Sequence, residues 1–364
     1  MTERNPNLDL LRCIAITMVA LFHAINFAEP GYSALKTFSV AGALGVELFF
    51  VLSGFLIGGL FWREYDTFGG VRKRRFFLRR ALRTVPPYLA GLLCAYLAVY
   101  LYRGQSFDWG YLLFLQNYYD VMPFFMVSWS LCVEEHFYLF APICLTVLAM
   151  VCRNRHSTAV VIFCFLSLIP LVLRLLNYSE TGYAFGYNTN ATHFSLDGLV
   201  LGVMVSYIYY YKVWSLDGLR RYRYLVYTIT FLAVVSSPYL HPGFKYTFGY
   251  YFLAWCFTLT VITAAAAKSP LLFARLFPRL TSNVAVTSYS TYLTHALVIH
   301  VMTRAYEFTS IENVGIRVFG MLIVIWFVGN VFYKVIEVPT FNLRSKLCPP
   351  RATESPRNDA SSVA

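Results

Sequence analysis

Ten apolar runs follow one another along the chain, each close to the length that crosses a lipid bilayer. They cover about 8–27, 43–62, 84–102, 129–151, 158–177, 193–211, 223–240, 248–268, 282–302 and 313–336. A transmembrane helix needs roughly 20 apolar residues, and none of these runs has the strict alternation of barrel strands. The pattern predicts an all-α, polytopic integral membrane protein with about ten transmembrane helices.

The composition supports the same class of protein. Hydrophobic residues make up 58% of the chain and charged residues only 13%, which no ordinary soluble domain of this size shows. We expect one transmembrane domain over 1–348, no soluble domain, and a polar, disordered tail over 349–364. The eight Cys form no Cys-x-x-Cys pair, so neither a metal site nor a disulfide framework is expected.

The basic residues predict the orientation of the chain. With both termini assigned to the cytoplasm, 23 of the 30 basic residues fall on the inner side. Such an excess marks cytoplasmic loops. The densest group has seven basic residues between positions 72 and 83.

Arg12 and His23 lie inside the first apolar run, where an ionisable side chain is costly and usually functional. Eleven steps of about 100° bring them to one face of a helix, roughly 16 Å apart along its axis. Ile16 and Val19 lie between them on that face. We interpret the face as one wall of a buried chamber.

Other titratable residues are predicted at the outer ends of their helices, at the level of His23. They are Glu47, Glu134, Glu135, His193, Asp197 and His295. The basic residues before the third run lie on the opposite side. This arrangement suits an enzyme that takes an anionic substrate from the cytoplasm and performs acid/base chemistry near the outer leaflet.

Sequence motifs in a fixed order extend over positions 8 to about 343. They are Arg12-x10-His23, the block from Gly45 to Ile57, Arg79-Arg80-x-x-Arg83, the block from Trp129 to Tyr138, His193-x-x-x-Asp197-Gly198, Tyr292-Leu293-x-His295 and Glu337-x-Pro339. With these blocks the chain resembles the acyltransferase-3 family of integral membrane acyltransferases, which in bacteria typically acylate sugar hydroxyls of surface glycans. Two positions depart from the family pattern: Glu47 replaces the usual Asp, and Ser195 replaces the usual Arg.

The resemblance implies an O-acyltransferase in a bacterial inner membrane. Its donor substrate would be acyl-CoA on the cytoplasmic side, acetyl-CoA being the first expectation, with no permanently bound cofactor and no metal. Its acceptor would be a hydroxyl of a cell-surface or exported glycan or a lipid-linked sugar. The bilayer is its other partner, and no nucleic acid is expected.

His23 is the candidate general base, because imidazole can accept a proton near pH 7 and pass it to a leaving thiolate. A carboxylate would orient its ring, and Glu134 and Glu135 are the candidates, with Asp197 and Glu47 behind them. The alternatives are a structural His23 and carboxylates that only contact interfacial water.

Donor binding is assigned to arginines on the inner side. Arg12 could hold a phosphate or the thioester carbonyl, or pair with Asp9 on its own face. Arg79, Arg80 and Arg83 could bind the phosphates of coenzyme A, although cytoplasmic basic loops also set topology and contact anionic lipid. Five residues are assigned to substrate binding or structure: Glu47, Trp129, Ser130, His193 and His295.

A proton-coupled secondary transporter is the alternative from another class, since buried Arg, His and Glu would also suit proton-coupled exchange. The charged blocks form no inverted repeat, and the arginines concentrate in one loop. Both observations favour the enzyme. A catalytically inactive sensor with the same fold is a third possibility.

The predicted orientation can be tested by labelling cysteines in intact cells. A Cys at Tyr183 should react with an impermeant thiol reagent added outside, and a Cys at Ser215 should react only after the membrane is opened. The opposite labelling would invert the topology.

Overall fold

The computed structural model describes residues 4–28, 41–152, 155–182 and 190–348, and these ranges contain helices and no strand. The helices are α1 (Pro6–Ala28), α3 (Gly45–Phe68), α4 (Lys73–Arg103), α5 (Trp129–Val151), α6 (His156–Thr181), α8 (Asp197–Tyr211), α9 (Asp217–Arg221), α10 (Arg223–Ser236), α11 (Pro242–Phe244), α12 (Tyr250–Ala266), α13 (Leu272–Leu276), α14 (Pro278–Glu307), α15 (Val314–Phe332) and α16 (Val338–Leu347). The predicted tail 349–364 and Tyr183 lie outside the described residues.

The predicted class, an all-α polytopic membrane protein, is confirmed, but the count of about ten spans is not. Each predicted apolar run coincides with a helix, yet only seven helical segments of the described chain are long and apolar enough to cross a membrane. With 15 and 14 residues, α8 and α10 are shorter than a usual span. The 30-residue α14 is long enough, but its Ser and Thr residues make it more polar.

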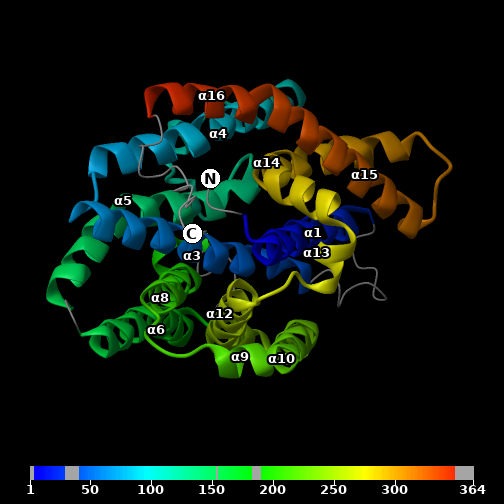
Figure 1. The fold of residues 1–364 in the computed structure, drawn as a ribbon. Coiled ribbons are helices and arrows are strands. Elements are labelled where there is room, and N and C mark those ends of the chain that lie inside the picture. The colour runs from blue at the N-terminus through cyan, green and yellow to red at the C-terminus, as the bar shows by residue number, and fades with distance from the viewer. Residues whose placement is uncertain (1–3, 29–40, 153–154, 183–189, 349–364) are drawn as a thin grey trace, which may run out of the picture.

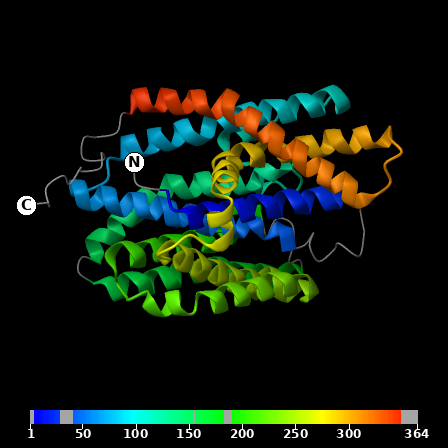
Figure 2. The same cartoon turned by 45° about the vertical axis from the view of Figure 1, so that its right-hand side comes forward.

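Three layers of helices make up the described bundle (Figure 1). α1, α3 and α5 form the middle layer, with α4, α14, α15 and α16 on one side and α6, α8, α10 and α12 on the other. The same order is seen after a 45° rotation (Figure 2). Across the layers α3 packs on α8, and α1 packs on α14. The middle layer therefore contacts both outer layers, and a site between layers must include its helices.

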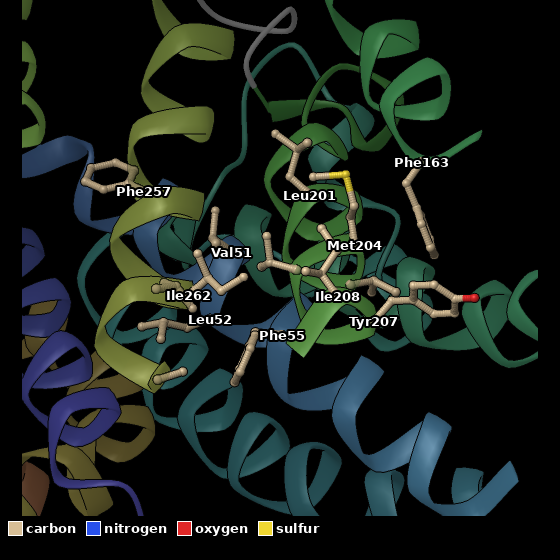
Figure 3. Packing of buried hydrophobic residues seen from close by; sticks show 14 of the residues in the cluster. Val51, Leu52, Phe55, Phe163, Leu201, Met204, Tyr207, Ile208, Phe257 and Ile262 are labelled. Atoms are coloured by element: carbon tan, nitrogen blue, oxygen red, sulfur yellow. The ribbon is translucent and has the colours of Figure 1, made fainter. Parts of the chain in front are cut away.

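The tightest contact, between α3 and α8, depends on glycines. A Cβ on Gly54 would lie 2.1 Å from the carbonyl oxygen of Leu199, and one on Gly202 would lie 2.2 Å from that of Val51. Close backbone approach at small residues is a common way to pack membrane helices. Figure 3 shows the apolar side chains that fill the space beside this contact, from α3, α6, α8 and α12.

A folded segment between α4 and α5 holds the beginning of α5 in place. It contains three short 3₁₀ turns, η2 (Trp109–Leu113), η3 (Gln116–Tyr118) and η4 (Met126–Ser128). The buried Gln116 side chain donates hydrogen bonds to the Tyr88 hydroxyl of α4 at 3.0 Å and to the Ser128 hydroxyl at 2.9 Å. Tyr88 in turn donates to the carbonyl of Tyr111 at 2.8 Å. These bonds fix α5 relative to α4.

Replacing Gly54 by Ala should destabilise the bundle, because the added methyl group would overlap the backbone of α8. We expect a cost of about 1–3 kcal/mol, the usual range for overpacking, seen as a lower thermal midpoint in detergent. Gly59→Ala on the same helix is the matched control, since no atom lies within 4 Å of its added methyl group. Equal midpoints for the two variants would contradict this account of the contact.

Candidate active site

A cavity of about 230 Å³ with a mixed polar and apolar lining lies between the middle layer and the α4–α14 side of the bundle. Five helices line it: α1, α3, α4, α5 and α14. Its charged and hydroxyl-bearing lining includes Arg12, Ser53, Arg80, Arg83, Ser130 and Glu134. Predicted donor-binding arginines and a predicted catalytic carboxylate thus share one cavity.

Glu134 is the centre of the hydrogen-bond network in this cavity. Its carboxylate lies 3.4 Å from the guanidinium of Arg80 on α4 and accepts hydrogen bonds from Ser53 of α3 at 3.1 Å and from Tyr138 at 2.5 Å. Tyr138 lies one turn after Glu134 on α5, so both side chains point the same way. The Arg80 guanidinium also lies 3.7 Å from the centre of the Tyr138 ring, a cation–π contact.

Arg12 pairs with Asp9, and its predicted role in donor binding stays a prediction. It lies 3.4 Å from the carboxylate of Asp9, which also pairs with Arg4 at 2.9 Å. One carboxylate therefore faces two arginines. Arg12 also lines the cavity with Arg80, so a positive charge remains available there to an anionic or carbonyl group of a ligand.

Of the other predicted site residues on α4 and α5, some line the cavity and some do not. Arg83 lines it, whereas Arg79 is absent from its lining and lies near Arg344 of α16, which has the same charge. Glu135 lies near Arg80 and near Thr84, which is itself part of the lining. Arg80 and Arg83, rather than all three arginines, are the α4 residues positioned to meet a ligand.

His23 lies beside a second histidine, His295 of α14. Their ring centroids are 5.1 Å apart at an interplanar angle of 48°. His295 is fully buried, its Nδ1 lies 2.5 Å from the carbonyl oxygen of Tyr292, and its Nε2 has no hydrogen-bond partner. Neither histidine is part of the cavity lining. The two rings form a pair next to the cavity.

Tyr292 connects the histidine pair to the cavity. Its ring lies 5.3 Å from that of His295, and its hydroxyl lies 2.6 Å from the Ser130 hydroxyl and donates to the carbonyl of Val127 at 2.8 Å. Both Tyr292 and Ser130 line the cavity. Tyr292 therefore contacts the cavity at Ser130 and the histidine pair at His295.

The level that the sequence predicted for Glu134 needs correction. Glu134 shares the cavity with Arg12 and Arg80 instead of contacting His23, and no hydrogen bond joins the His23 ring to a carboxylate among the described residues. The reason is the course of α4, which begins at Lys73 and carries Arg80 two turns into the bundle, where α5 supplies the neutralising carboxylate. Arg80, predicted on the inner side, and Glu134, predicted at an outer helix end, therefore lie side by side.

Glu47 and Asp197 belong to a separate buried cluster around Arg174 of α6. Arg174 pairs with Asp197 at 2.6 Å and donates to the carbonyl of Phe194 at 2.9 Å. Glu47 interacts with both members of this pair, and one oxygen of each carboxylate has no hydrogen-bond partner. Arg174 thus supplies a guanidinium to Asp197 where Ser195 replaces the family arginine.

His193 and Trp129 lie outside the cavity. The His193 ring stacks on that of Tyr118, with centroids 5.9 Å apart, and the indole of Trp129 meets the Phe50 ring edge-on at 6.0 Å. Both contribute to packing around the beginnings of α5 and α8. Their predicted substrate-binding roles stay predictions.

Sequence reasoning overlooked Arg174 and gave no role to Tyr138 or Tyr292. Arg174 had a usable signal, because it is an arginine inside an apolar run, as Arg12 is. The two tyrosines had a weaker signal, since both stand in the sequence motifs, but only their contacts show what they do.

The cavity lining combines charge with hydroxyl groups. Three arginines, one carboxylate and six hydroxyl-bearing side chains line it, and no group of three or more metal-ligating side chains occurs among the described residues. Together the fold and this cavity define a polytopic membrane protein with a cavity between its helices that is lined by charged and hydroxyl groups.

Comparison with known proteins gives the family. The model of an acyltransferase domain matches residues 5–331, nearly the whole chain, and the chain therefore belongs to the acyltransferase-3 family, as its motifs indicated.

Among curated proteins, the chain is 28% identical over 322 residues to a Staphylococcus aureus (strain COL) protein with the provisional name of O-acetyltransferase, covering 81% of this chain and 50% of that protein. It is 26% identical to O-acetyltransferase OatA of Staphylococcus aureus (strain NCTC 8325 / PS 47), covering 92% of this chain and 57% of OatA. The chain thus spans about half the length of these relatives. No solved structure matches it.

Arg174→Gln should lower the thermal midpoint strongly, because it leaves two buried carboxylates without a cation. Breaking a buried ion pair typically costs about 3–5 kcal/mol. Arg304→Gln is the control, since its ion pair with Glu307 is exposed and should contribute about 0–1 kcal/mol. Adding Asp197→Asn to Arg174→Gln should recover part of the loss. A midpoint unchanged by Arg174→Gln would refute the assigned role.

Proposed function

We propose that the protein transfers an acetyl group from acetyl-CoA, bound from the cytoplasmic side, to a hydroxyl of a cell-surface or exported glycan. The protein would act in a bacterial inner membrane with both termini in the cytoplasm. The observation that supports this most is the single cavity in which Arg12, Arg80 and Arg83 face Glu134 and Ser130. The arginines suit an anionic donor, and the hydroxyls suit its reacting carbonyl.

The names of two relatives support acetyl as the acyl group and oxygen as its acceptor. The excess of basic residues on the predicted inner side supports entry of the donor from the cytoplasm. The glycan acceptor rests on the family resemblance. Because the chain spans about half of its relatives, these assignments concern the membrane domain alone.

In the proposed reaction, the acceptor oxygen attacks the thioester carbonyl carbon. A C–O bond forms, the C–S bond breaks, and the hydroxyl proton passes to His23, which returns it to the departing thiolate. As negative charge develops on the acyl oxygen, the Ser130 hydroxyl would turn its proton toward that oxygen and away from the Tyr292 hydroxyl, which it contacts in this structure. His295, rather than Glu134 or Glu135, is the neighbour placed to position the His23 ring.

Acetyl transfer by the purified protein is the direct test of the function. Thiol release from acetyl-CoA in detergent should depend on an added glycan acceptor, and mass spectrometry should find the acetyl ester on that acceptor. A transporter has no measurable activity without a sealed membrane. Absence of both transfer and hydrolysis with a folded protein, over several acceptors, would argue against the enzyme.

His23→Ala should lower the transfer rate by about 10²–10⁴-fold, the scale of general acid/base catalysis, with little change in donor binding. His295→Ala should have a similar effect if the two rings act as a unit, and the double variant should be hardly worse than either single one. Near-normal turnover by a folded His23→Ala protein would leave His23 as a structural residue.

Arg80→Gln should weaken the binding of acetyl-CoA, because it removes a positive charge from the cavity and leaves Glu134 without its cation. We expect a loss of about tenfold or more, the usual scale for a charge-assisted hydrogen bond. Arg74→Gln on the exposed beginning of α4 is the matched control. Equal affinities for both variants would show that Arg80 makes no specific contact with the donor and that the basic residues between positions 72 and 83 act only through their overall charge.

A further inference from the structure

A second, larger cavity opens at the end of the bundle where α1 begins and α3 ends. Its volume is about 1010 Å³, and it lies between α1 and α3 on one side and α8, α9 and α12 on the other. Five basic side chains line it against two carboxylates: Arg4, Arg12, Arg63, Lys212 and Arg220 against Asp9 and Asp217. An excess of positive charge around a concave site favours an anionic ligand.

Two of these cations are available to a ligand. Asp9 lies within ion-pair distance of Arg4 and Arg12, and Asp217 pairs with Arg220 at 2.8 Å. For Arg63 and Lys212, both exposed, the described residues provide no ion pair and no hydrogen bond to the side-chain nitrogens. These two side chains come from different helix ends and meet at one cavity.

Aromatic rings lie in the same cavity. Trp214 is 53% exposed although it lines the cavity, and Tyr209 and Tyr210 line it as well. Exposed rings beside free cations fit a ligand that has both a flat base and phosphates, because a base stacks on an aromatic face while arginine and lysine bind phosphate oxygens. Because tryptophan also lies among lipid headgroups at membrane interfaces, an anionic lipid headgroup is the competing ligand that the experiment below separates from a nucleotide.

The two cavities differ in volume, and each therefore fits a different part of an acyl-CoA donor. Sites for small molecules usually measure about 300–1,000 Å³, so the large cavity can hold a nucleotide and the small one, at about 230 Å³, cannot. Arg12, Leu56 and Leu60 line both cavities. A ligand with a bulky anionic end and a thin arm would fit across this shared boundary.

We propose that the large cavity binds the nucleotide end of the acyl-CoA donor. The base stacks on Trp214, the phosphates contact Arg63 and Lys212, and the arm passes Leu56 and Leu60 to bring the thioester into the small cavity. This inference rests on the proposed function. It assigns the phosphate site to the α3 and α8 ends instead of the Arg79-Arg80-x-x-Arg83 motif.

Adenosine 3′,5′-bisphosphate is the probe, since it carries the base and the 3′-phosphate of the donor without its thioester. Binding to the full chain in detergent, measured by calorimetry, should weaken about tenfold for Arg63→Gln and for Lys212→Gln, as expected when one charged phosphate contact is lost. Lys346→Gln, an exposed basic residue of α16 outside the cavity, is the control. Size-exclusion profiles establish that the variants remain folded.

Kinetics provide an independent measurement. Arg63→Gln and Lys212→Gln should raise the KM for acetyl-CoA about tenfold with kcat retained, because the contacts are made equally in the ground and transition states. Nucleotide binding that depends on Arg63 and Lys212 supports the site even if no acetyl transfer is found, which would contradict only the proposed function.

Three results would overturn the inference. The first is nucleotide binding that is unchanged by Arg63→Gln and Lys212→Gln. The second is binding that is instead weakened by Arg74→Gln, which would return the phosphates to the α4 run. The third is a loss of bound phosphatidylglycerol from the two variants with no change in nucleotide affinity, since the cations would then serve a lipid headgroup.

Discussion

The ion pair of Arg80 and Glu134 is the contact on which the small cavity depends. An arginine stays charged inside a bundle, so a carboxylate must be supplied where its guanidinium lies. Glu134 does so from α5, and Ser53 and Tyr138 satisfy its remaining lone pairs. α4 and α5 belong to different layers and meet at this pair. The small cavity lies beside the pair, and polar side chains of both helices line it. The turns between α4 and α5 hold that geometry.

Much of the fold could be predicted because its signals are local. Apolar runs identified the helices, and helical periodicity placed Arg12 and His23 on one face, which lies against α14 in the structure. The number of spans was harder to predict, because α8 is apolar through burial between α3, α6 and α12 rather than through contact with lipid. Hydropathy alone does not separate these two environments.

The lateral neighbours of each charged group could not be predicted. Order along the chain gives a depth but does not say which helix stands beside which. Arg174 therefore went unassigned although it neutralises Asp197, and Glu134 was placed with His23 although its partner is Arg80. Both errors concern contacts between helices that are distant in sequence. The catalytic roles of the motif residues stay predictions.

The apolar section of α1 has a further, electrical consequence. Ile16 and Val19 are each 2% exposed and pack with Tyr292 and Leu293. Apolar side chains therefore fill the space around α1 between the levels of Arg12 and His23. A membrane voltage falls mainly across such a region of low dielectric constant, where moving one elementary charge takes about 2.3 kcal/mol per 100 mV. In the proposed reaction the acetyl group leaves the sulfur, and the proton that His23 returns takes its place there. Because acetyl and proton are exchanged across this region, no net charge moves and the transfer does no work against the membrane voltage.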